Sequence, residues 1–219
     1  MSKAPGVERP EPRWPVVIAV LAAAALHYVL PPSMRVGPPW LLAGVVVALV
    51  VVALVARRAG RNTLNEVAGY AILVVLTVGM LYALGSVLLA LIHHAEQAPD
   101  LLRSGSALWA TNVLVFANWY WRLDAGGPNE RERRAAHTSG AFLFPQMTTT
   151  LPCGPGGADA AQWRPGFVDY LFVAFNTSTA FSPTDVPVLS AWAKLAMMVQ
   201  ALISFTAVVL IGARAVNIL

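Results

Sequence analysis

Long apolar runs, separated by short segments that carry nearly all of the charge, constrain this chain more than any other feature. A helix that rises about 1.5 Å per residue needs roughly 17 to 25 residues to cross the hydrocarbon core of a bilayer. Only 12% of the residues are charged, against about 25% in ordinary soluble domains. The chain is therefore predicted to be an all-α integral membrane protein in direct contact with the lipid bilayer. The expected spans are residues 14–30, 40–56, 67–92, 104–121 and 191–211.

The expected span 104–121 is the most polar of the five, because it contains Asn112 and Asn118. An asparagine within a span costs free energy unless its amide is paired. Both side chains are therefore expected to face other helices or water. The aromatic sequence Trp119-Tyr120-Trp121 at the end of this run is typical of a membrane interface.

The Lys and Arg residues predict which ends of the spans face the cytoplasm. The tail before the first span carries three, the 57–66 loop three and the 122–166 loop five, whereas the alternate loops carry only Arg35 and Arg103. The positive-inside rule then predicts a multi-pass protein with a cytoplasmic N-terminus. Because these basic residues lie beside apolar runs, the pI of about 9.6 is attributed to membrane topology and no nucleic-acid partner is expected.

Three regions follow from this pattern. Residues 1–121 form an N-terminal region of four spans, residues 122–166 a polar Gly/Pro-rich loop, and residues 167–219 a C-terminal unit ending in the last span. The breaker-rich loop is expected to be poorly packed, with residues 140–145 and Trp163 docked on the membrane surface.

The segment 167–186 is the part of the sequence that is most informative about function. It begins as an apolar run of about ten residues, which as a helix reaches only roughly 15 Å, half of the hydrocarbon thickness. It then becomes rich in Ser, Thr, Pro and Asp before the last span. Non-helical backbone at membrane depth is tolerated only where protein or water surrounds it. The prediction is five transmembrane helices plus one re-entrant, pore-loop-like half-helix, and the alternative is six transmembrane helices.

The polar side chains of this segment are the candidate site. Hydroxyls, amides and a carboxylate can replace water around a cation, and rings of such groups arise when copies of a chain assemble. One hypothesis is an ion channel-like or cation-binding protein that takes a monovalent cation as a homo-oligomer. The candidate pore or ion-binding residues are Asn176, Thr177, Ser178, Thr179, Ser182, Thr184 and Asp185.

The region 167–217 resembles the pore helix, filter and inner helix of tetrameric potassium channels. The strip from Thr177 to Asp185 aligns with that family's T-L-T-T-V-G-Y-G-D, and Thr177, Thr179 and Asp185 match it. The resemblance implies a tetramer if the protein is channel-like. Ser182 and Thr184 replace both filter glycines, so a potassium-type cage of backbone carbonyls is not expected.

A second resemblance covers residues 107–219. The sequence is similar to the bacterial membrane family known as domain of unknown function 1345 in four places. These are Trp119-Tyr120-Trp121, Phe167-Val168-Asp169-Tyr170, Pro183-Thr184-Asp185-Val186 and Ala215-Val216-Asn217. The resemblance implies a multi-span protein of the bacterial inner membrane and no defined substrate.

Enzymatic chemistry is not expected. The four histidines lack metal-ligand spacing such as H-E-x-x-H, Cys153 is the only cysteine, and Ser182 has no G-x-S-x-G context. Asp169 is expected to cap a helix or pair with Arg164. No metal, catalytic residue or cofactor is predicted. The alternatives to a channel are a non-conducting accessory or structural membrane subunit and a small-solute carrier.

Overall fold

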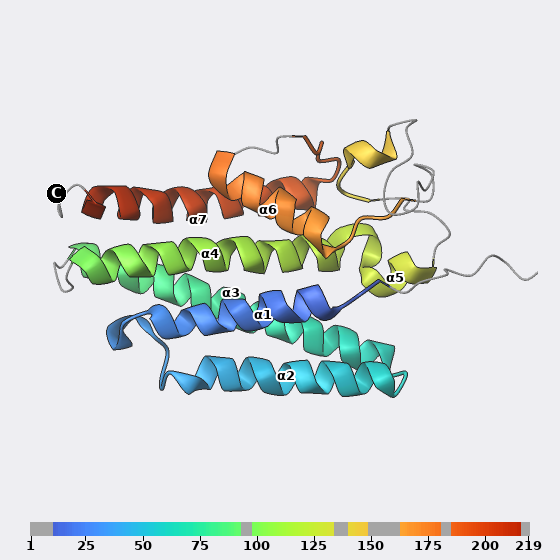
Figure 1. Ribbon diagram of the computed structural model, residues 1–219, viewed down its shortest axis with the longest axis horizontal. Coiled ribbons are helices and arrows are strands. Elements are labelled where there is room, and N and C mark those ends of the chain that lie inside the picture. The colour runs from blue at the N-terminus through green and yellow to red at the C-terminus, as the bar shows by residue number, and fades with distance from the viewer. Residues whose placement is uncertain (1–10, 93–97, 134–139, 149–162, 181–184, 216–219) are drawn as a thin grey trace, which may run out of the picture.

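The protein is a bundle of helices that lie roughly along one axis (Figure 1). The computed structural model describes residues 11–92, 98–133, 140–148, 163–180 and 185–215, and within these ranges it has no β-strand. Four short 3-10 helices, at His27–Val29, Pro32–Met34, Asp124–Gly126 and Pro145–Met147, lie in the connections. The α-helices are α1 Trp14–Leu26, α2 Trp40–Arg58, α3 Asn62–Ile92, α4 Ala98–Leu123, α5 Pro128–Arg133, α6 Phe167–Ala180 and α7 Ala191–Ala215.

Several helices have the length and composition of membrane spans. Within the described residues, three are long and apolar enough to cross a membrane, namely Trp40–Arg58, Asn62–Ile92 and Ala191–Gly212. Trp14–Val29 is also apolar but shorter. The predicted all-helical membrane class is therefore supported by the fold.

The hairpin between α2 and α3 shows how the sequence ends one helix and starts the next. The N–H of Arg61 donates to the carbonyl of Ala56 at 2.9 Å, and the N–H of Gly60 donates to the carbonyl of Arg57 at 3.1 Å. This is a Schellman arrangement, which requires a left-handed residue after the helix. Gly60, with a φ of +70°, adopts that conformation without the steric cost of a Cβ.

Helix α4 is the centre of the bundle. It contacts α1, α3, α6 and α7, and Figure 1 shows it between the α1 to α3 group and the α6 and α7 pair. A helix that faces protein on most sides can carry polar side chains at little cost, which explains its lower hydropathy. Thr111, Asn112 and Asn118 on α4 are all buried.

Helices α6 and α7 begin at the same end of the bundle. Tyr170, near the start of α6, and Trp192, near the start of α7, both pack against Phe142, with ring centroids 6.0 and 6.1 Å away. Ser178, near the end of α6, instead meets Gln200 in the middle of α7. The 14 residues of α6 therefore end beside the middle of α7 (Figure 1).

The segment that enters α7 is fixed to the loop after α5. The N–H of Leu143 donates to the carbonyl of Pro187 at 2.9 Å, and the N–H of Leu189 donates to the carbonyl of Ala141 at 2.8 Å. The loop thereby holds the chain at the end where α6 began.

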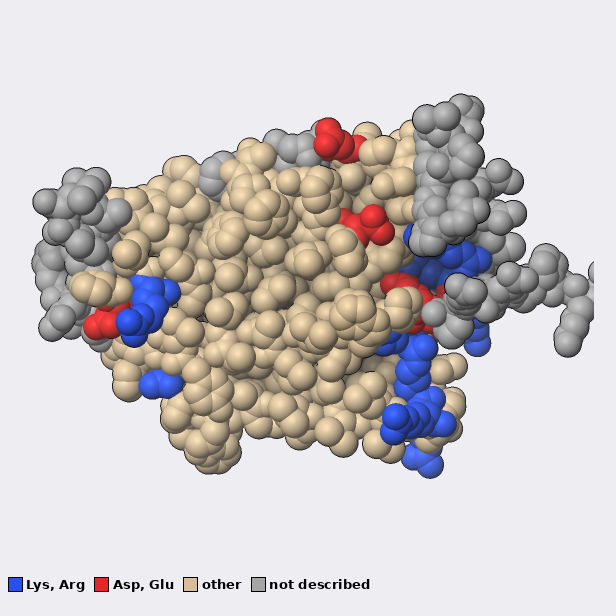
Figure 2. All heavy atoms as spheres, viewed as in Figure 1, with Lys and Arg blue, Asp and Glu red and all other residues tan. Residues whose placement is uncertain are grey.

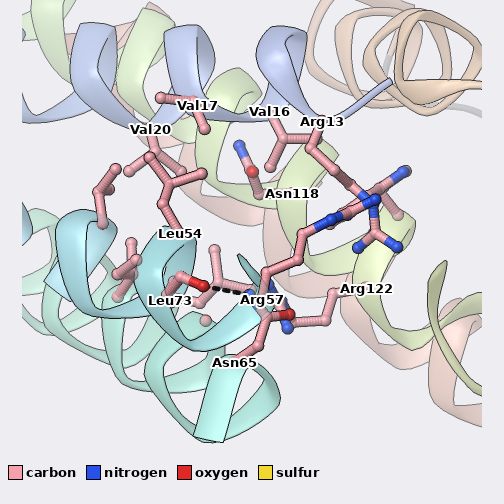
Figure 3. A pocket seen from close by; sticks show the side chains of 15 residues that line it. Arg13, Val16, Val17, Val20, Leu54, Arg57, Asn65, Leu73, Asn118 and Arg122 are labelled. Carbon is pink, nitrogen blue, oxygen red and sulfur yellow. Dashed lines mark hydrogen bonds between the residues drawn. The ribbon is translucent and has the colours of Figure 1, made fainter. Parts of the chain in front are cut away.

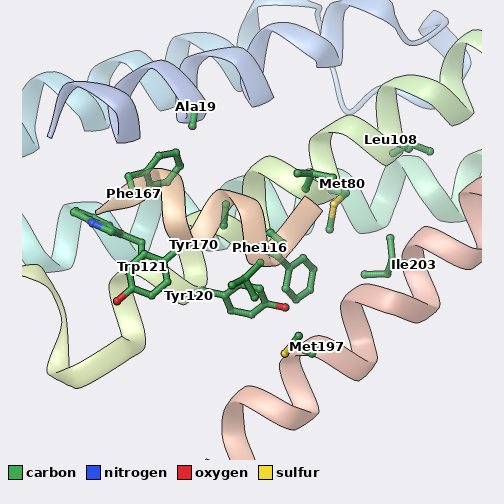
Figure 4. Packing of buried hydrophobic residues seen from close by; sticks show 14 of the residues in the cluster. Ala19, Met80, Leu108, Phe116, Tyr120, Trp121, Phe167, Tyr170, Met197 and Ile203 are labelled. Carbon is green, nitrogen blue, oxygen red and sulfur yellow. The ribbon is translucent and has the colours of Figure 1, made fainter. Parts of the chain in front are cut away.

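The described part of that loop does not match the expected poorly packed, surface-docked segment. Phe142 and Phe144 are buried, and Phe142 also contacts Tyr120 of α4. These aromatic rings fill the space that α4, α6 and α7 leave at this end of the bundle. Figure 4 shows Tyr120, Tyr170 and Phe167 in the same buried cluster.

Candidate functional site

The polar side chains of α6 are positioned by a capped helix start. Asp169, the third residue of the helix, accepts a hydrogen bond from the backbone N–H of Gly166 at 2.8 Å. This contact stabilises a helix N-terminus. The predicted capping role of Asp169 is confirmed.

Two of the candidate pore residues face the interior of the bundle. Thr177 and Ser178 are buried, with exposed fractions of 1% and 0%. The hydroxyl of Thr177 donates to the carbonyl of Val173 at 2.8 Å, and the hydroxyl of Ser178 accepts from the Gln200 amide at 2.8 Å. Both side chains therefore take part in hydrogen bonds inside the protein.

Gln200 is the centre of a polar network that joins three helices. Its amide nitrogen also donates to the carbonyl of Ala174 on α6 at 2.7 Å. Its side-chain oxygen accepts from the hydroxyl of Tyr120 on α4 at 2.5 Å. Every polar atom of this fully buried side chain thus has a partner on α4 or α6.

Asn112 adds a second connection between α4 and α7. Its amide nitrogen donates to the backbone carbonyl of Gln200 at 3.1 Å and to the Ser204 hydroxyl at 2.7 Å. The expectation that Asn112 faces another helix is confirmed. Asn118 is also buried, but its amide donates to Leu114 of its own helix at 2.8 Å.

The remaining candidate residues do not gather at the same place. Thr179 is exposed and donates to the Phe175 carbonyl of its own helix at 2.9 Å. Asn176 is half-buried and Asp185 is exposed. Ser182 and Thr184 lie outside the described residues. Among the described candidate residues, only Ser178 has a side-chain hydrogen-bond partner on another helix, Gln200, because Thr177 bonds to Val173 of its own helix.

The outward face of α6 is apolar. Val168, Phe172 and Phe175 are 67%, 51% and 46% exposed. Their spacing places them on one side of a helix, and Thr177 and Ser178 lie on the other. In a single chain, α6 therefore presents hydrocarbon outwards and its buried hydroxyls inwards.

A second buried polar cluster lies where α4 meets the loop that follows it. Asp124 is fully buried and accepts from the hydroxyl of Tyr170 at 2.6 Å and from the N–H of Ala141 at 2.5 Å. Arg131 donates to the carbonyls of Trp121 and Asp124 at 2.7 and 2.9 Å. The cluster ties the start of α6 to the loop.

The same arginine forms an ion pair with the segment before α1. Arg131 lies 3.1 Å from the carboxylate of Glu11, which also accepts from the indole N–H of Trp121. The guanidinium of Arg131 lies over the rings of Trp121 and Tyr170, 5.6 and 5.3 Å from their centroids. The burial of Arg131 was not predicted, because residues 122–166 were expected to form a polar, poorly packed loop.

Sequence reasoning also did not predict the roles of Gln200 and Tyr120. A usable signal was present, because Gln200 and Ser204 are polar residues four apart in an otherwise apolar run, and such pairs lie on one face of a helix. Polar residues inside a span normally face other helices.

No group of three or more His, Cys, Asp or Glu side chains that could hold a metal ion occurs within the described ranges.

No protein-family model matches the chain, and no curated protein or solved structure is significantly similar to it. The resemblances to the family of domain of unknown function 1345 and to potassium channels stay predictions.

Proposed function

We propose that this protein is a non-conducting membrane subunit with five spans and one re-entrant half-helix, α6. The observation that carries the proposal is the orientation of α6. Its buried hydroxyl on Ser178 is bound by Gln200, and its exposed side chains other than Thr179 are apolar. A cation path needs oxygen atoms that face a water-filled passage. The Ser178 oxygen instead accepts a hydrogen bond from a neighbouring helix inside the bundle.

The re-entrant assignment rests on length and direction. The 14 residues of α6 rise about 21 Å at 1.5 Å per residue, short of the roughly 30 Å hydrocarbon core. The pairing of Leu189 with Ala141 returns the chain to the end where α6 began. A sixth full span would instead deliver the chain to the opposite end.

The cytoplasmic N-terminus rests on the distribution of charge. Figure 2 shows Lys and Arg gathered mainly at the end of the bundle near α5, with a broad uncharged band beside it. Residues Arg13, Arg57, Arg58 and Arg61 belong to helix ends and turns at this end. The positive-inside rule places such an end in the cytoplasm, and in a bacterium the bilayer is the inner membrane.

Cysteine labelling tests the re-entrant assignment. In a Cys153→Ser background, a cysteine at the exposed position Ala180 should resist a membrane-impermeant maleimide added to either side of the membrane. A cysteine at Arg58 provides the matched control, since it should react from the cytoplasmic side. Reaction of the Ala180 position from the outside alone would establish six spans.

Cation conduction by a homo-oligomer is the second candidate, and the exposure of Thr179 and Asp185 favours it. Exposed polar groups near the end of α6 could face one another across a symmetry axis.

Flux of K⁺ and Na⁺ through proteoliposomes distinguishes the two candidates. The non-conducting proposal expects flux equal to that of protein-free liposomes for the wild type, Thr179→Val and Asp185→Ala. Selective flux that either substitution reduces would replace it with the channel.

A further inference from the structure

A cavity of about 60 Å³ lies between α1, α2, α3 and α4, at the end of the bundle that carries most of the arginines. Because a cavity needs roughly 10 to 15 Å³ to hold one water, this volume takes a group of several non-hydrogen atoms. It is separate from the polar network around Gln200. Figure 3 shows Arg13, Arg57 and Arg122 at one side of it.

The lining of this cavity is strongly positive. It includes three arginines and two asparagines, Asn65 and Asn118, and no carboxylate among the described residues that line it. The nearest acidic partner is Glu132, which lies 2.9 Å from Arg13 but 3.8 Å from Arg57. Glu11 and Glu66 also act electrostatically on Arg13 and Arg122, but neither they nor Glu132 line the cavity among the described residues.

Two guanidinium nitrogens of the arginines that line this cavity have no hydrogen-bond partner among the described residues. The Nε of Arg13 and one terminal nitrogen of Arg57 are buried without a hydrogen bond to any described residue. Burial outweighs the charge of Glu132 and lowers the pKa of Arg13 below its ordinary value. A buried donor without an acceptor costs free energy, and an anion in the cavity would remove that cost.

Arg122 is held in place by aromatic rings. Its guanidinium lies over Tyr70 and Trp121, 5.3 and 5.7 Å from the ring centroids. It also packs against Gly69, where a Cβ would overlap it. Within the described part of the chain, no carboxylate lies within ion-pair distance of Arg122. Its guanidinium is therefore oriented by the rings, and Glu66 acts on its charge only from beyond contact distance.

The other side of the cavity is aliphatic. Figure 3 shows Val17, Val20 and Leu54 on the side away from the arginines. Leu54 lines the cavity and is also 42% exposed on the outer face of α2. Its neighbour Val55 is 59% exposed. The apolar wall thus continues to the surface that faces the hydrocarbon of the bilayer.

We infer that this cavity binds the phosphate group of an anionic membrane lipid, with an acyl chain along the apolar wall that Leu54 extends to the surface. Arginine is suited to phosphate because its planar group donates two parallel hydrogen bonds. A free phosphate would use the guanidinium groups but not the aliphatic side. The location also fits, because the arginines lie at helix ends, at the level of lipid headgroups.

The test uses the full-length protein purified in detergent. Its thermal unfolding and its bound lipid, seen by native mass spectrometry, are measured with added phosphatidylglycerol, phosphatidylcholine or inorganic phosphate. Phosphatidylglycerol should raise the unfolding temperature by several degrees and remain bound, whereas phosphatidylcholine should have little effect. Inorganic phosphate should not reproduce the shift.

Arg57→Gln and Arg58→Gln form a matched pair of variants. The two arginines are adjacent at the end of α2, and each substitution removes one positive charge. Only Arg57 lines the cavity, whereas Arg58 is exposed. Arg57→Gln should weaken phosphatidylglycerol binding about tenfold, the effect of losing one charge-assisted hydrogen bond. Arg58→Gln should bind as the wild type does.

Three results would overturn the inference. Equal losses in the two variants would show diffuse attraction of lipid to a basic surface. Full stabilisation by inorganic phosphate would assign the cavity to a soluble anion. If the wild type bound phosphatidylglycerol no better than phosphatidylcholine, the cavity would not select an anionic lipid. Should Arg57→Gln fail to fold, Arg57→Lys keeps the charge without the planar pair of donors and should still weaken binding.

Discussion

Replacement of Gln200 by leucine tests whether the buried polar network holds α6 against α4 and α7. The substitution keeps a similar side-chain volume, so a large cavity is not expected. It removes three side-chain hydrogen bonds, to Tyr120, Ala174 and Ser178.

The expected loss of stability follows from these bonds. Hydrogen bonds between membrane helices contribute about 0.6 kcal/mol on average, so three give about 2 kcal/mol. The fully buried hydroxyl of Tyr120 is also left without its acceptor, which costs about 1 to 3 kcal/mol. Allowing for overlap between these two costs, Gln200→Leu should lower the free energy of unfolding by about 2 to 4 kcal/mol.

Reversible unfolding in mixed micelles, followed by circular dichroism, measures this change. Thr179→Val is the control, because it also removes a hydroxyl from this region but from the exposed side of α6. It should change the free energy by no more than about 0.5 kcal/mol. If Gln200→Leu cost no more than this control, the network would not be what holds α6 to α4 and α7.

Three further predictions concern the charged end of the bundle and the orientation of the chain. Asp124→Asn should destabilise the protein by about 1 to 3 kcal/mol, because the new amide places an N–H₂ group against one of two hydrogen-bond donors, Tyr170 and Ala141. Thermal unfolding measures the loss, and Asp185→Asn at an exposed position is the control. Gly69→Ala should displace the Arg122 guanidinium that lies against it and reduce phosphatidylglycerol-dependent stabilisation, while the unfolding temperature without lipid changes little; an unaltered lipid response would mean that Arg122 takes no part in binding. In a Cys153→Ser background, a cysteine at Arg35 should react with an impermeant maleimide added to intact cells and one at Arg58 should not, and the reverse pattern would invert the proposed orientation.

The helices were predictable because each apolar run is long and interrupted by Pro, Gly or charge. The α2 to α3 hairpin is the clearest case, since Arg57, Arg58 and Gly60 mark the end of a helix in sequence and in structure. The first span is shorter than expected, because the α-helix ends at Leu26 and continues only as a 3-10 turn.

The partners of the polar residues could not be predicted in the same way. Asn112 was expected to need a partner, but Gln200 and Ser204 lie 88 and 92 positions further along the chain. Their meeting depends on how α7 packs against α4, which no local pattern encodes. The burial of Phe142 and Phe144 was missed for a similar reason, because a Gly/Pro-rich context resembles an exposed loop until the helices around it are placed.

The candidate strip 176–185 was recognised by its polarity, but polarity alone does not say which way a helix faces. Ser178 and Thr179 are neighbours in sequence, yet one is fully buried and the other exposed. A rotation of about 100° per residue separates them on the helix. That rotation decides whether a hydroxyl meets Gln200 or the outside of the bundle.

The central position of α4 has a consequence for how the protein is made. In the proposed five-span topology, α4 reaches the membrane after α1, α2 and α3 but before α7 exists, because helices leave the ribosome in chain order. Its buried Asn112 then has no Ser204 to bind, and a polar span is costly in lipid on its own. We therefore expect α4 to remain beside the insertion machinery until α7 is synthesised, so that truncation before Ala191 leaves α4 incompletely integrated and open to proteolysis.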